Sequence, residues 1–99
     1  MGIDYDADLG YGIKLTEELE TDDPNFKTIA SGNCYTGDII SFLCIKESVH
    51  SASSYDDEPF INPNELIVQP DWDNKIYSWC KENGIIDPKI GWWLCAIVA

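Results

Sequence analysis

The residues of this 99-residue chain that are best suited to chemistry are acidic, and three of them stand at alternate positions near its start. Asp4, Asp6 and Asp8 lie in the stretch DYDADLGYGIKL. Alternating carboxylates also open the EF-hand calcium loop, which needs glycine at its sixth position and glutamate at its twelfth. Counted from Asp4, these positions hold Leu9 and Leu15, and leucine cannot coordinate a cation. The spacing argues against an EF-hand, and divalent-metal binding by the aspartates remains only an alternative.

Other catalytic or metal-binding arrangements find little support. Paired catalytic carboxylates need environments that separate their pKa values, whereas the acids near the N-terminus stand among small or flexible residues. The sole histidine, His50, is expected at the surface. The four cysteines have no C-x-x-C spacing of the kind that binds zinc. We therefore predict no enzymatic activity, no cofactor and reduced thiols, with Cys44, Cys80 and Cys95 in the core.

The charge of the chain restricts its partners. Eighteen acidic residues face six lysines and no arginine, which gives a formal net charge of −12. Such a surface repels nucleic acid and anionic membranes, and it attracts basic proteins. No apolar run approaches the roughly 20 residues of a membrane-spanning helix, and the first residues lack the basic and then apolar pattern of a signal peptide. We therefore expect an intracellular protein that binds neither nucleic acid nor membrane directly and recognises a basic partner.

The acids fall into three groups, in segments expected to be loops or strand edges. The alternative is that these groups are solvated loops that only keep the protein soluble. An exposed tyrosine beside acidic residues is typical of a binding hot spot, so two tyrosines join the prediction. The predicted partner-binding residues are Asp4, Asp6, Asp8, Glu17, Glu18, Glu20, Asp22, Asp23, Asp56, Asp57, Glu58, Tyr5 and Tyr11.

Hydrophobic patterning predicts strands and one helix as the scaffold for these residues. The strands are expected at 10–16, 26–30, 39–45 and 90–99, and an irregular connection at 51–65. The last strand is apolar on both faces, so we expect it to be central in the sheet and covered on each side.

The one predicted helix spans residues 72–82, with Asp71 as its N-cap. Its apolar stripe consists of Trp72, Ile76, Trp79 and Cys80. The simplest arrangement is an α+β fold, in which a small, mostly antiparallel sheet of three to five strands carries this helix on one face. The chain length fits a single domain over residues 1–99.

Two motifs, YDADLGYGIKL and PKIGWWLCA, resemble small acidic proteins encoded in bacteriophage genomes. The resemblance implies an accessory protein in the host cytoplasm. Some such proteins inhibit host defences, including CRISPR effectors and restriction enzymes, by acting as DNA mimics. The resulting hypothesis is a non-enzymatic inhibitor that binds a basic host protein, such as a nuclease or CRISPR effector. A phage structural or assembly component, which would form a defined oligomer such as a homodimer, is the other alternative.

Overall fold

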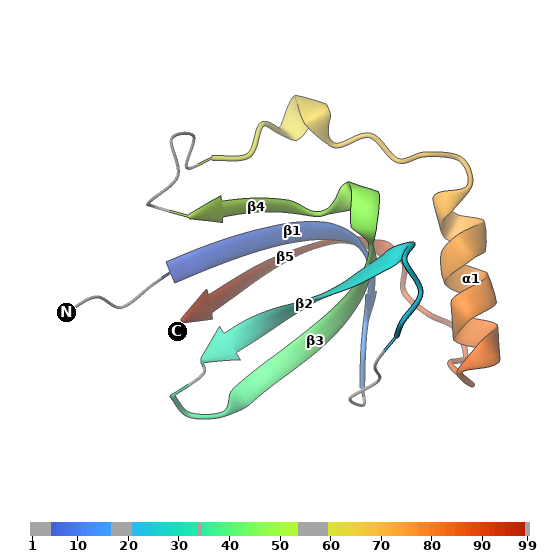
Figure 1. The fold of residues 1–99 in the computed structure, drawn as a ribbon, viewed down its shortest axis with the longest axis horizontal. Helices are drawn as coiled ribbons and strands as arrows, with labels where there is room; N and C mark the ends of the chain where they lie inside the picture. Colours follow the sequence, from blue (N-terminus) through green and yellow to red (C-terminus); the bar gives the residue numbers. More distant parts are fainter. Residues whose placement is uncertain (1–4, 17–20, 34, 54–59, 99) are drawn as a thin grey trace.

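The computed structural model describes residues 5–16, 21–33, 35–53 and 60–98 of the chain (Figure 1). These residues form five strands, two short 3-10 helices and one α-helix. In chain order the elements are β1 (Tyr5–Lys14), β2 (Phe26–Asn33), β3 (Asp38–Ile45), η1 (Lys46–Ser48), β4 (His50–Ser53), η2 (Pro63–Glu65), α1 (Trp72–Glu82) and β5 (Gly91–Val98).

The five strands form one sheet in the order β3-β2-β5-β1-β4, and a further pairing of β3 with β1 closes the sheet on itself. All pairings are antiparallel except that of β2 with β5, which is parallel over two rungs. The predicted α+β fold is confirmed, as is the central place of β5.

A tight bend lets two successive strands use the same edge of β1. β3 pairs with the C-terminal part of β1, and β4 pairs with its N-terminal part, with η1 between them. Ser48 in η1 is fully buried. Its hydroxyl accepts a hydrogen bond from the Tyr11 backbone N–H at 2.9 Å and donates one to the Ile45 carbonyl at 2.6 Å. Ser48 thus supplies the partner that a buried backbone N–H requires where the ladder is interrupted.

Two predictions about strands were wrong. The first strand begins at Tyr5 rather than at residue 10, because the alternating acidic stretch pairs with β4 on one side and β5 on the other. The start of the segment expected to be irregular, 51–65, belongs to β4, because pairing with β1 satisfies the backbone of this small, polar run. Tertiary pairing therefore overrides weak local strand propensity in both places.

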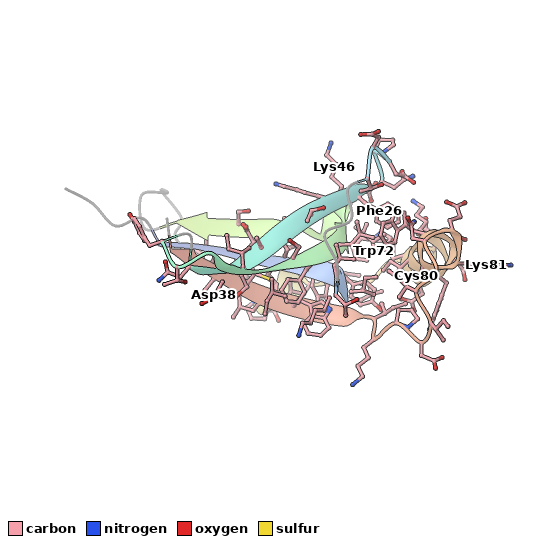
Figure 2. The ribbon with its side chains drawn as sticks, turned by 90° about the horizontal axis from the view of Figure 1, so that it is seen from below. Phe26, Asp38, Lys46, Trp72, Cys80 and Lys81 are labelled. Carbon is pink, nitrogen blue, oxygen red and sulfur yellow. The ribbon has the colours of Figure 1, made fainter. Side chains whose placement is uncertain are left out.

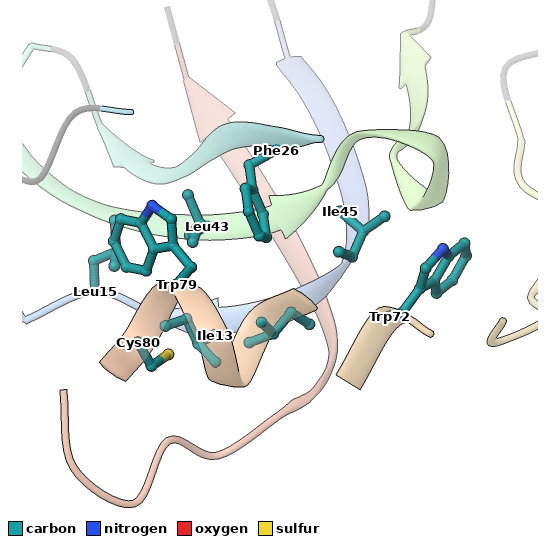
Figure 3. Close-up of a cluster of buried hydrophobic side chains, with 9 residues drawn as sticks. Ile13, Leu15, Phe26, Leu43, Ile45, Trp72, Trp79 and Cys80 are labelled. Atoms are coloured by element: carbon teal, nitrogen blue, oxygen red, sulfur yellow. The ribbon is translucent and has the colours of Figure 1, made fainter. Parts of the chain in front are cut away.

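The predicted helix is confirmed, and it begins and ends at the predicted residues. It lies across one end of the sheet (Figures 1 and 2). Cys80 points toward the sheet and Lys81 away from it (Figure 2). The helix stripe packs on apolar residues at the strand ends (Figure 3). This core contains Ile13, Leu15, Phe26, Leu43, Ile45, Trp72, Ile76, Trp79 and Cys80.

Asp71 occupies the N-cap position, but its side chain makes no capping hydrogen bond. The predicted position of the N-cap is therefore confirmed, but Asp71 does not cap the helix with its side chain. The carboxylate of Asp71 lies 3.1 Å from the ammonium of Lys75, one turn along the helix. Its backbone is helical (φ −91°, ψ −8°), whereas a capping side chain normally belongs to a residue in the extended region.

A second, smaller core lies on the other face of the sheet. It contains Ile29, Phe42, Cys44 and Cys95, with Val49 and Trp93 packed against it. Cys44 and Cys95 are buried free thiols here, and Cys80 is a buried free thiol in the core beneath the helix. The prediction that these three cysteines are core residues is confirmed.

Candidate partner-binding surface

The structure describes only half of the acidic side chains of this protein. Nine of the eighteen are described, together with all six lysines, so most of the net charge of −12 comes from the other nine. Among the predicted partner-binding residues, those outside the described side chains are Asp4, Asp6, Glu17, Glu18, Glu20, Asp56, Asp57, Glu58 and Tyr5; the backbone of Tyr5 and Asp6 is in β1. The remaining four are Asp8, Asp22, Asp23 and Tyr11, which the structure places in different settings.

Asp8 lies within the sheet and not in a loop. It stands opposite Cys95 of β5 and Ser51 of β4, whose hydroxyl donates a hydrogen bond to its carboxylate. Burial raises the pKa of Cys44 to about 12 and that of Cys95 to about 11, and the charge of Asp8 adds to both increases. The described residues contain no group of three potential metal-ligating side chains. With its backbone extended and hydrogen-bonded on both sides, the Asp6–Asp8 segment does not adopt a cation-binding loop.

Tyr11 contributes to internal packing. Its ring lies 5.8 Å from that of Trp72 and 5.4 Å from that of Trp92, measured between centroids. Its hydroxyl donates a 2.6 Å hydrogen bond to the carboxylate of Asp73 in the first turn of α1. Burial and then this hydrogen bond raise the pKa of Tyr11 to about 12. The side chain links β1 to α1, and as placed it is not a free aromatic anchor for a partner.

Asp22 and Asp23 lie in the loop before β2, next to the helix. Asp22 is exposed, whereas the carboxylate of Asp23 accepts hydrogen bonds from the backbone N–H and side-chain amide of Asn25, both at 2.9 Å. The indole N–H of Trp79 donates to the hydroxyl of Thr21 at 3.3 Å. These contacts hold the loop that contains Asp22 and Asp23 against α1.

An acidic groove of about 310 Å³ lies between this loop and α1. We call this cavity the acidic groove; it is lined by Asp23, Asn25, Phe26, Asp71, Asn74, Lys75, Ser78, Trp79 and Glu82. Its single lysine, Lys75, is engaged by Asp71. The hydrogen bond with Lys75 is the main cause that lowers the pKa of Asp71, so this carboxylate stays ionised. The groove therefore presents a surplus of negative charge above the buried rings of Phe26 and Trp79.

Sequence reasoning missed Asp71 and Glu82 as candidates for partner binding. A signal for them was present, since positions 71, 75, 78 and 82 are spaced by four, three and four residues and share one helical face. This face lies beside the apolar stripe of α1. What the sequence did not reveal is that the loop carrying Asp23 lies against the same face.

No protein-family model, curated protein or solved structure matches this chain. Within the described part of the chain, no helix has the length and apolar character needed to cross a membrane.

Proposed function

We propose that this protein is a non-enzymatic, acidic interaction protein of the host cytoplasm. It binds a basic, nucleic-acid-binding surface of a host protein and inhibits it, in the manner of phage anti-defence proteins and DNA mimics. The observation that carries the proposal is the net charge of −12 in a chain without arginine. A folded protein carries this self-repulsion at a cost, and a partner of opposite sign relieves it.

The acidic groove is the part of the described surface that best suits such a partner. Asp23, Asp71 and Glu82 line it against one lysine that is already paired. A lysine or arginine side chain of the partner would lie between these carboxylates, with its aliphatic portion over the edge of the Trp79 ring. Glu17, Glu18 and Glu20 precede Thr21 in the sequence, and the hydroxyl of Thr21 accepts a hydrogen bond from Trp79, which lines the groove; this proximity in sequence supports a contribution from these three acids.

Affinity capture with two charge-reversed variants tests the proposal. The groove variant carries Glu82→Lys in the groove and Asp22→Lys in the exposed loop beside it; Asp23 is retained because it organises this loop. The matched control carries Asp38→Lys and Glu47→Lys, which are exposed, lie outside the groove and change the net charge equally. Tagged proteins are incubated with bacterial lysate at about 0.1 M and about 0.5 M salt, where screening shortens charge interactions. Bound proteins are identified by mass spectrometry.

The expected result is a nucleic-acid-binding protein that the wild-type and control proteins capture at low salt. DNA or high salt should release it, and the groove variant should fail to capture it. Equal capture by both variants would remove the groove from the proposal. If no nucleic-acid-binding protein is captured at all, or only further copies of the chain, the inhibitor function is contradicted and a structural or assembly role is favoured.

A further inference from the structure

β5 carries apolar side chains on both faces, and the rest of the described chain covers the two faces unequally. Cys95 belongs to the second, smaller core, and Trp93 packs against it. Trp92 and Leu94 point to the opposite face, because side chains alternate along a strand. Trp92 packs against the core beneath the helix, whereas Leu94, two residues further along, is 71% exposed. An apolar run on both faces is typical of a strand buried on both sides, but no element of the described part of the chain covers β5 at Leu94.

The exposed apolar surface extends from Leu94 across three strands. In one row of the sheet, Leu9 of β1 stands opposite Leu94 of β5 and also opposite His50 of β4. In the next row, three alanines are aligned in the same way. All six side chains are partly or fully exposed, and we call them the open face: Ala7, Leu9, His50, Ala52, Leu94 and Ala96. The small alanines leave the surface flat beside Leu94, so another element can approach the sheet closely.

The neighbouring elements leave this face open. Helix α1 lies at the far end of the sheet, where it packs on Ile13 and Leu43 (Figures 1 and 3). In Figure 1 the chain through η2 passes beside β4. With both elements in place, Leu94 still has most of its surface accessible. Exposed apolar surface on a sheet is a common feature of protein-binding sites.

The charge of the chain decides between the candidate occupants. A second copy would bring another −12 to the contact, and the repulsion opposes close approach of the two chains. A basic partner is attracted instead, and none of the six lysines of this chain belongs to the open face to repel it. Asp8 alternates with Ala7 and Leu9 and points to the other side of the sheet, so the open face itself carries no carboxylate that the apolar contact would have to bury.

We propose that the open face is the apolar anchor for a basic protein partner. The partner contributes an amphipathic segment whose aliphatic or aromatic side chains pack on Leu9 and Leu94, with lysine or arginine flanking its apolar stripe. This inference rests on the proposed function and adds to it, since charge guides the encounter while the open face supplies the contact that excludes water.

The test uses the full chain and a defined probe. The probe is an amphipathic helical peptide of leucine and lysine; the comparison peptides are oligolysine and a leucine–glutamate peptide of the same pattern. Binding is measured by titration with backbone amide NMR shifts. The Leu94→Ser variant removes the anchor, and Ile86→Ser is the matched control, because Ile86 is 86% exposed and does not belong to the open face.

The leucine–lysine peptide should bind the wild-type and Ile86→Ser proteins equally and the Leu94→Ser protein at least about tenfold more weakly, since truncated anchors cost the most. The amide shifts should centre on Leu9, Leu94 and Ala96. Equal binding of the leucine–lysine peptide to all three proteins would overturn this inference. In that case, binding of oligolysine would still support the proposed function. Failure of both basic peptides would contradict both proposals. Equal binding of the leucine–glutamate peptide, or a wild-type dimer that Leu94→Ser dissociates, would overturn the choice of a basic partner.

Discussion

Replacement of Gly12 by alanine should break the contact that closes the sheet. Gly12 stands opposite Cys44 where β1 meets β3, and a Cβ atom at this position would lie 1.9 Å from the carbonyl oxygen of Leu43 and 2.7 Å from the Cα of Cys44. Real Cβ contacts are essentially never shorter than 3.0 Å, so the two strands must separate by about 1.1 Å. The obstructing atoms belong to the backbone, and no side-chain rotation can relieve the clash.

The cost follows from what this separation disturbs. β1 and β3 are paired over only three rungs, and Ile13 and Leu43 beside the clash are almost completely buried in the core beneath the helix. Overpacking usually costs about 1–3 kcal/mol and sometimes more. Because the backbone itself must move, we expect Gly12→Ala to lower the free energy of unfolding by about 3 kcal/mol or more, out of a typical total of about 5–15 kcal/mol.

Gly91 provides a matched control, because it stands directly opposite Gly12 in the β1–β5 ladder and a Cβ there meets no atom within 4 Å. Thermal and urea unfolding of both variants should be followed by circular dichroism and tryptophan fluorescence. Gly12→Ala should lower Tm by more than about 10 °C, at about 4–8 °C per kcal/mol, whereas Gly91→Ala should change stability by no more than about 1 kcal/mol. If both variants melt within a few degrees of each other, β1 and β3 do not meet as closely as described.

Three further outcomes are expected. Tyr11→Phe should destabilise the protein by about 1–2 kcal/mol below pH 10, because it removes the hydrogen bond to Asp73. Folding raises the pKa of Tyr11 from 10.0 to about 12, so the stability difference between wild type and variant in urea unfolding should shrink as the pH rises from 10 to 12. A difference that stays constant over this pH range would contradict the role of the hydrogen bond. Cys44 and Cys95 should resist alkylation at pH 8 and react in denaturant, as read by peptide mass spectrometry; rapid labelling of the native protein would contradict their burial. Ile76→Ala should cost about 2–5 kcal/mol in urea unfolding, since the side chain is fully buried between α1 and the sheet, and a loss below 1 kcal/mol would contradict that packing.

The sequence alone determined the helix and the general fold class. The stripe formed by Trp72, Ile76, Trp79 and Cys80 has the 3.6-residue period of a helix that buries one face, and the structure buries all four side chains. The β-branched and aromatic residues of 39–45 likewise predicted a strand, which the structure extends to Asp38. These patterns depend only on residues that are close together in the sequence, so they can be recognised without knowing which segments pack against each other.

The tertiary structure alone decided which segments pair and which surfaces remain exposed. The strand character of residues 5–9 and 50–53 arises from pairing between segments more than forty residues apart, and neither segment has a strong pattern of its own. The meeting of Asp23 with Asp71 and Glu82 depends equally on where a loop folds back on a helix. The apolar pattern of β5 predicted cover on both faces, but only the packed structure shows that Leu94 has no cover from the described chain. Nonlocal contacts fix these features, and hydrophobic periodicity records only that a face is apolar, not what covers it.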